Sequence, residues 1–213
     1  MLTLCGFSAS NYYNKVKMVL LEKNVTFTEE YVATGLVDEA VLSSSPLGKI
    51  PFLRTPQGPI CESEAIAEYI EASYPSPALL PSDPFAAAKV RELIIFIELH
   101  SELVVRELYG QAYFGGALSE SNLARIRKQV EKNVAGLKRL AKFSPYIAGD
   151  SFTLADCAAF ASLPLIGMTT KIVYGEDMLL AGGVDYKAYI KMVSERPSAQ
   201  KVLADRKAGT SKS

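Results

Sequence analysis

Ile50-Pro51 and Glu62-Ser63 stand at two points where a predicted sheet meets a loop or a helix. Proline cannot donate a hydrogen bond to a strand ladder. A cis bond before Pro51 would therefore leave the N–H and C=O of Ile50 free to pair with an extended peptide. The alternative is a trans proline that only ends a loop.

Glu62-Ser63 could hold the two charges of an amino acid. The first N–H groups of a helix have no intrahelical acceptor, and together with a serine hydroxyl they attract a carboxylate. Glu62 could accept an ammonium group beside them. The alternative is that Ser63 is a plain N-cap. With Ile50, the pair predicts a site for an α-amino acid zwitterion next to a peptide bond.

A small α/β layer is needed to position these residues. Residues 1–76 alternate strands and helices. Strands are predicted at 2–7, 25–32, 50–53 and 58–62, with a hairpin turn over 54–58. Helices are predicted before Lys23-Asn24, within 36–44, and over 63–74 with Ser63 as the N-cap.

The second half of the chain has a helical period. A proline-rich stretch at 75–84 marks a domain boundary, so we expect a linker at 77–84, an all-helical domain over 85–206 and a flexible tail over 207–213. Long helices are predicted over 84–114 and 119–143, and Pro197 begins the last one. A further helix starts at Thr153, where Asp156 completes a capping box. In 119–143 the predicted buried face is Leu123, Ile126, Val130, Val134, Leu137 and Leu140, and the predicted solvated face is Arg127, Lys128, Glu131, Lys132 and Lys138.

Composition narrows the function classes. Lys+Arg and Asp+Glu both number 23 in 213 residues, which gives no electrostatic case for nucleic acid or a polybasic membrane surface. The apolar runs are shorter than a spanning helix and no leader is recognised, so we expect a cytoplasmic protein. Cys5, Cys61 and Cys157 form no C-x-x-C and are expected to be buried thiols. A single histidine, His100, argues against a metal site built on several imidazoles.

Three motifs in order resemble the cytosolic glutathione transferases, of the serine type. They are G-K-I-P-x-L at 48–53, E-S-x-A-I-x-x-Y at 62–69 and G-x-x-F-T-x-A-D at 149–156. The resemblance implies a thioredoxin-like domain followed by an all-helical domain, and a homodimer. It also implies glutathione as co-substrate with no permanently bound cofactor or metal. The implied glutathione-binding residues are Ser10, Lys49, Ile50, Pro51, Glu62 and Ser63.

Each of these residues has an implied role in that family. Glu62 and Ser63 would hold the γ-glutamyl group, and the backbone of Ile50 beside cis Pro51 would bind the cysteinyl part. Lys49 would reach the glycine carboxylate. These roles agree with the zwitterion and peptide chemistry expected from the residues themselves.

The loop "FSASNYYNKV" is the expected site of thiol activation. A free thiol is mostly protonated at neutral pH, so hydrogen-bond donors at a helix N-terminus are needed to stabilise the thiolate. The spacing from Val16 in serine-type members indicates Ser10. Asn11 and Tyr12 are the other candidate catalytic residues, and Ser8 and Tyr13 lie close enough to compete.

The electrophile is expected against Tyr13, Tyr109, Tyr113 and Phe114. The resulting hypothesis is an enzyme that adds the glutathione thiol to electrophilic, hydrophobic substrates in detoxification. Isomerisation or reductive removal of a halide, both with glutathione, is an alternative on the same scaffold. A non-enzymatic protein-binding or stress-regulatory module is the alternative from another class.

Overall fold

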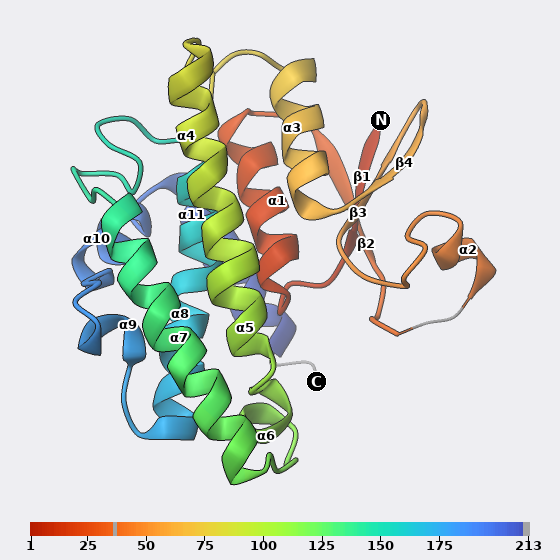
Figure 1. Cartoon of the computed structure of the whole chain (residues 1–213). Helices are drawn as coiled ribbons and strands as arrows, with labels where there is room; N and C mark the ends of the chain where they lie inside the picture. Colours follow the sequence, from red (N-terminus) through yellow and green to blue (C-terminus); the bar gives the residue numbers. More distant parts are fainter. Residues whose placement is uncertain (36–37, 211–213) are drawn as a thin grey trace. The chain divides into compact units, whose positions relative to one another are not determined.

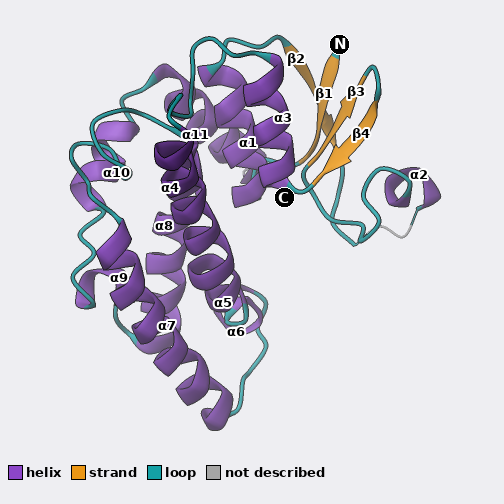
Figure 2. Cartoon of the chain, turned by 45° about the horizontal axis from the view of Figure 1, so that its top comes forward, coloured by secondary structure: helices purple, strands orange, loops and turns teal. Residues whose placement is uncertain are grey.

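The computed structural model describes residues 1–35 and 38–210. They form two compact units, the first containing Met1–Leu79 and the chain from Ser194 onward, the second containing Leu80–Val193. All of the strands in these described ranges lie in the first unit, whereas the second is built from helices (Figure 2). A thioredoxin-like domain followed by a helical domain, as predicted, is confirmed.

The first unit contains a four-stranded sheet with strand order β2-β1-β3-β4. β1 and β2 are parallel, whereas β3 is antiparallel to both β1 and β4. Thr55 pairs with Gly58, so the hairpin turn is only Pro56-Gln57, shorter than the predicted 54–58. The strands are β1 (Leu2–Gly6), β2 (Phe27–Tyr31), β3 (Phe52–Thr55) and β4 (Gly58–Cys61).

Helices lie on both sides of this sheet (Figure 1). α1 (Asn11–Glu22) and α3 (Ser63–Ser73) lie side by side on one of them. On the other, α2 (Glu39–Leu42) places Val41 in a small core with Cys5, Ile50 and Phe52. The predicted segment 36–44 therefore contains a short helix, but residues 36 and 37 lie outside the described residues.

The end of the chain differs from the expected domain boundaries. α11 (Pro197–Thr210) begins at the predicted proline but packs on α1 and so belongs to the first unit. Glu22 accepts hydrogen bonds from Arg196 and Ser198, and Lys17 pairs with Asp205 at 2.5 Å. The expectation of a flexible tail from 207 is wrong for residues 207–210, which continue α11; residues 211–213 lie outside the described residues.

The predicted helix over 84–114 is divided into several segments. At its centre the hydrogen bonds change to a π-helical register, and Ser101 donates its hydroxyl to the C=O of Phe96 at 3.3 Å. A turn at Glu107-Leu108 then separates the last segment. The segments are α4 (Pro84–Ile95), η1 (Phe96–Glu102), α5 (Leu103–Arg106) and α6 (Tyr109–Tyr113).

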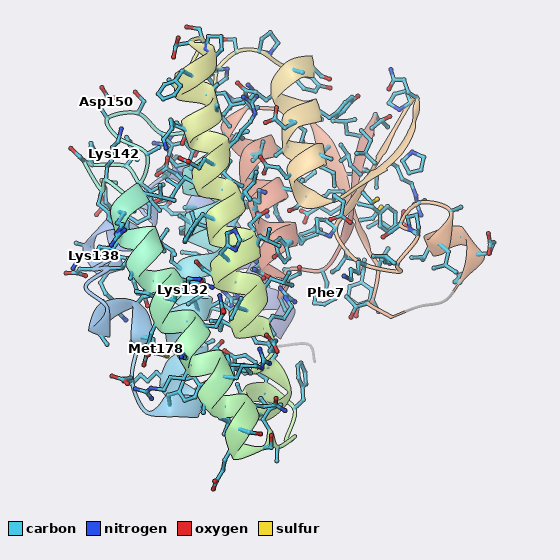
Figure 3. All side chains as sticks on the ribbon, viewed as in Figure 1. Phe7, Lys132, Lys138, Lys142, Asp150 and Met178 are labelled. Carbon is cyan, nitrogen blue, oxygen red and sulfur yellow. The ribbon has the colours of Figure 1, made fainter. Side chains whose placement is uncertain are left out.

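α7 (Glu120–Leu140) follows the predicted amphipathic pattern, and its apolar face is at least partly buried. Lys132 and Lys138 are exposed on it, as Figure 3 shows for these labelled side chains. The remaining helices of the second unit are α8 (Leu154–Tyr174), α9 (Met178–Ala181) and α10 (Lys187–Val193).

α8 is the central helix of the second unit. Its predicted capping box is confirmed, because Asp156 accepts from the backbone N–H of Thr153 at 2.8 Å. By length and hydropathy α8 could cross a membrane, which the apolar runs of the sequence did not indicate. However, 61% of its 18-residue apolar stretch is buried inside the protein. Burial in a helical core accounts for this composition.

Candidate functional site

Ser10 is the N-cap of α1. Its Oγ accepts a hydrogen bond from the N–H of Tyr13 at 3.3 Å, and its C=O accepts from the N–H of Asn14 at 3.0 Å. A serine hydroxyl that accepts in this way keeps its own proton for another partner. Ser10 is half-buried at a helix N-terminus, where the backbone dipole favours negative charge. This geometry suits a donor to a thiolate.

The residues around Ser10 are held by their side chains and by burial. Asn14 donates its side-chain amide to the C=O of Ser8 at 2.8 Å, which fixes the loop before the helix. Asn11 is buried and Tyr12 is half-buried on the first turn of α1. Phe7, labelled in Figure 3, stacks obliquely on Tyr31 at the end of β2. The loop is therefore well supported on both sides.

Tyr13 does not form part of a substrate surface, contrary to the sequence expectation. Its side chain is 2% exposed, and its hydroxyl donates to Glu29. Burial, together with the hydrogen bond and charge of Glu29, raises the pKa of Tyr13 well above its ordinary value. A hydroxyl engaged in this way cannot serve as the thiol donor. The cause is the parallel pairing of β1 with β2, which carries Glu29 over α1.

The start of α3 differs in detail from the prediction. Glu62, not Ser63, is the N-cap residue, and it provides no side-chain cap. Its φ is 68°, an uncommon left-handed conformation for a residue other than glycine. Backbone strain of this kind is typical of functional sites. Glu62 is exposed, whereas Ser63 is the first helical residue and is 8% exposed.

Lys15 lies behind Ser63 and was not recognised from the sequence. Its side chain is 1% exposed, and its ammonium group donates to Glu64 at 2.5 Å and to the Oγ of Ser63 at 3.4 Å. α1 thus links the N-cap serine of one helix to the first residue of another. A helical lysine normally indicates a solvated face, and only the packing of α1 between the sheet, α3 and α11 turns this one inward.

Residues 49–51 directly precede β3, which is an interior strand of the sheet, so the expected position at a sheet edge is wrong. The bond before Pro51 is cis, and Pro51 is buried. The side chain of Ile50 is 8% exposed, but among the described residues its N–H and C=O have no hydrogen-bond partner. Lys49 is exposed, and its N–H donates to Ser45 at 3.2 Å. The backbone of Ile50 therefore has the free groups that the family resemblance implies beside a cis proline, and its pairing with an extended peptide stays a prediction.

The three cysteines are free thiols that differ in burial. Cys5 is fully buried, and burial raises the pKa of its thiol to about 11, although Arg54 opposes the rise. Cys157 is also buried, whereas Cys61 is partly exposed, which differs from the prediction. Within the described ranges, no group of three or more His, Cys, Asp or Glu side chains could hold a metal ion.

The predicted aromatic substrate residues of the second half have internal partners. The hydroxyl of Tyr109 donates to Glu102 at 2.8 Å, and burial together with the charge of Glu102 raises its pKa. Tyr113 shares a hydrogen bond of 2.6 Å with Thr169, and its ring lies edge-on to Tyr109. Phe114 is 80% exposed. Their rings lie on or beside α6 in the second unit, and a role in substrate binding stays a prediction.

Comparison with known proteins resolves the family. Residues 4–78 match the family described as "Glutathione S-transferase, N-terminal domain", and residues 120–177 match "Glutathione S-transferase, C-terminal domain". The chain is 41% identical over 208 residues to a glutathione S-transferase of Pseudomonas putida, covering 98% of this chain and 94% of that protein. The chain belongs to the glutathione S-transferase family.

The chain is also similar to proteins of lower identity. A stringent starvation protein A homolog of Pasteurella multocida is 28% identical, covering 95% of this chain and 90% of that protein. The solved structure of a glutathione S-transferase from Methylobacterium radiotolerans, in complex with glutathione sulfonate, has a TM-score of 0.77 and 26% identity, covering 95% of this chain and 94% of that one. The glutathione transferase fold is thus shared over nearly the whole chain.

Proposed function

We propose that this family member is an enzyme that activates the thiol of glutathione and adds it to electrophilic, hydrophobic substrates. The observation that carries the proposal is the geometry of Ser10. Its Oγ accepts from the N–H of Tyr13, so its proton is left to donate to sulfur at the positive end of α1. Such a donor lowers the thiol pKa and so increases the thiolate fraction at neutral pH.

The reaction follows from this arrangement. The thiol proton is released to solvent, and the thiolate sulfur forms a bond to the electrophilic carbon. With an addition substrate, the carbon next to the new bond takes up a proton; with a halogenated substrate, the halide leaves with the bonding pair. No permanently bound cofactor or metal takes part in this scheme.

The binding roles of the first unit are part of the proposal. Ser63 and the first N–H groups of α3 receive the γ-glutamyl carboxylate, and the exposed Glu62 receives its ammonium group. The free backbone of Ile50, beside the buried Pro51, pairs with the cysteinyl part. The exposed Lys49 receives the glycine carboxylate. Tyr109, Tyr113 and Phe114 supply apolar surface for the electrophile.

Ser10→Ala tests the assignment of the activating group. We expect kcat with a chloro-nitroaromatic substrate to fall about 100-fold, the order expected for removing one oxyanion-type donor, while the dissociation constant for glutathione changes little. Ser8→Ala is the matched control, because its backbone C=O, rather than its hydroxyl, holds the loop. Asn11→Ala and Tyr12→Phe test the other two candidates. Loss of rate in either of these with Ser10→Ala unaffected would reassign the donor.

The proposal includes a homodimer in the cytoplasm. Ile95, Leu99 and Leu103 follow one another at intervals of four residues along α4, η1 and α5, and they are 50%, 51% and 46% exposed. Exposed apolar side chains that recur at helical spacing, here called the stripe, are typical of a surface that contacts another protein. The three free cysteines fit a reducing compartment, where glutathione is available.

A second function is favoured by the relatives named for stringent starvation. It is a protein-binding module of the stress response that retains the fold without turnover. Calorimetry with glutathione, followed by an activity assay over electrophiles, separates the two. Heat of binding with turnover supports the enzyme, whereas binding without turnover of any electrophile supports the module. Isomerisation and dehalogenation are tested in the same assay by replacing the substrate.

A further inference from the structure

Two buried lysines bridge α1 and α3 at opposite ends. Lys15 pairs with Glu64 at the start of α3, and Lys23 pairs with Glu71 near its end, each at 2.5 Å. Burying an ammonium group is costly unless it is paired, so both pairs contribute to packing. Only Lys15 also contacts a residue of the proposed glutathione site, the Oγ of Ser63.

The position of Glu64 creates an electrostatic conflict at that site. Its carboxylate stands on the first turn of α3, beside the N–H groups that would receive the ligand carboxylate. Its Oε1 is buried and has no hydrogen-bond partner among the described residues. An unneutralised Glu64 would repel an incoming carboxylate and would also attract the hydroxyl proton of Ser63.

We infer that Lys15 is a positioning residue that confers preference for a peptide with a free α-carboxylate on its γ-glutamyl group. Its ammonium group neutralises Glu64 and donates to Ser63, so the hydroxyl proton of Ser63 is turned toward the ligand. The inference rests on the proposed function, because it concerns the same ligand. It adds Lys15 to the residues that determine glutathione binding, and it gives a functional reason for the burial of this lysine.

The test compares glutathione with γ-aminobutyryl-cysteinylglycine, which lacks only the α-carboxylate. For the native protein we expect tighter binding of glutathione, measured by calorimetry. Lys15→Met should weaken the binding of glutathione about 10- to 100-fold, the range of a charge-assisted hydrogen bond to a charged group. The affinity for the analogue should not change. Lys15→Arg should retain the preference, since it keeps the charge.

Lys23→Met is the matched control. It removes a lysine with the same burial and the same kind of partner from the same helix pair, so it should lower the melting temperature without changing the ratio of the two affinities. If Lys15 were only structural, Lys15→Met would weaken both peptides equally, and this result would overturn the inference. No preference for glutathione in the native protein would instead contradict the proposed function itself.

Glu64→Gln provides a second test of the inference that does not depend on removing a buried lysine. Its side chain is 28% exposed, so the substitution is tolerated more readily. Without the carboxylate of Glu64, the positive charge of Lys15 is no longer neutralised inside the protein and attracts the ligand carboxylate. The preference for glutathione over the analogue should therefore increase. A decrease of the preference in Glu64→Gln would overturn the inference even if Lys15→Met failed to fold.

Discussion

The hydroxyl oxygens of Ser10 and Ser63 accept hydrogen bonds from different kinds of donor. The oxygen of Ser10 accepts from the backbone N–H of Tyr13, and that of Ser63 accepts from the ammonium group of Lys15. In both cases the hydroxyl oxygen accepts a hydrogen bond from inside the protein, and in the proposed function its proton is donated to the ligand. Under the proposed function, these two hydroxyls would stabilise two negative groups of glutathione, its sulfur and its carboxylate.

Gly6 is the residue that permits this packing at the end of β1. A side chain there would bring its Cβ to 2.7 Å from the ring of Tyr13 and 3.3 Å from Ile50, and its φ is 147°. We expect Gly6→Ala to lower the free energy of unfolding by about 1–3 kcal/mol through overpacking. Urea unfolding followed by circular dichroism measures this loss.

Gly58→Ala is the control for the backbone contribution at Gly6. Gly58 has a similar φ of 140°, but a Cβ there would meet nothing within 4 Å. Its substitution should therefore cost less than Gly6→Ala. Equal losses would show that backbone conformation, and not contact with Tyr13, explains the glycine.

At the scale of elements, α11 is fastened to α1 by two carboxyl groups. Burial alone would raise the pKa of Glu22, but the hydrogen bonds and charge of Arg196, with the hydrogen bond of Ser198, outweigh it and leave the pKa lowered. The pKa of Asp205 is lowered in the same way, against burial, by Lys17 and Lys201. Both groups therefore favour the folded state when ionised.

The docking of α11 should weaken in acid. A lowered pKa gives stability that is complete above the unfolded value, 4.5 for Glu22 and 3.8 for Asp205, and is lost as the pH falls through the folded values. The protection factors of the α11 amides, which correct for the intrinsic exchange rate at each pH, should decrease between about pH 5 and pH 3. The side chain of Ser8 packs directly against Gly209 of α11. The loop before Ser10 should therefore lose protection from exchange together with α11.

The double substitution Glu22→Gln with Asp205→Asn checks this origin. The two amides do not titrate, so the variant should be less stable at neutral pH and show a shallower dependence on acid. An acid dependence as steep as that of the native protein would assign the effect to other carboxyl groups.

At the scale of the whole molecule, the stripe of Ile95, Leu99 and Leu103 is the proposed contact with a second copy. Leu99→Glu places a charge at its centre, and we expect a shift from dimer to monomer in sedimentation experiments because a charge at such a contact would be desolvated. Ile172→Glu is the control, since Ile172 is 52% exposed on α8, outside the stripe. A dimer that persists in Leu99→Glu would place the interface elsewhere.

The sequence by itself determined the features that depend on neighbouring residues. The strands, the capping box at Thr153 and Asp156, and the start of α11 at Pro197 follow local rules of periodicity and capping. The family motifs are likewise short segments. They led to the sheet, to the helical second half and to candidate positions Ser10, Ile50 and Ser63, whose roles in binding and catalysis remain predictions.

Only the tertiary structure decided the side-chain contacts between segments that are distant in the sequence. The inward direction of Lys15 and Lys17 depends on α3, β2 and α11, which lie 12 to 188 residues away along the chain. The engagement of Tyr13 by Glu29 and the place of α11 in the first unit have the same origin. A periodic pattern records which faces are apolar, but it cannot show that a charged side chain is buried with its counter-ion, because that depends on a partner chosen by the fold.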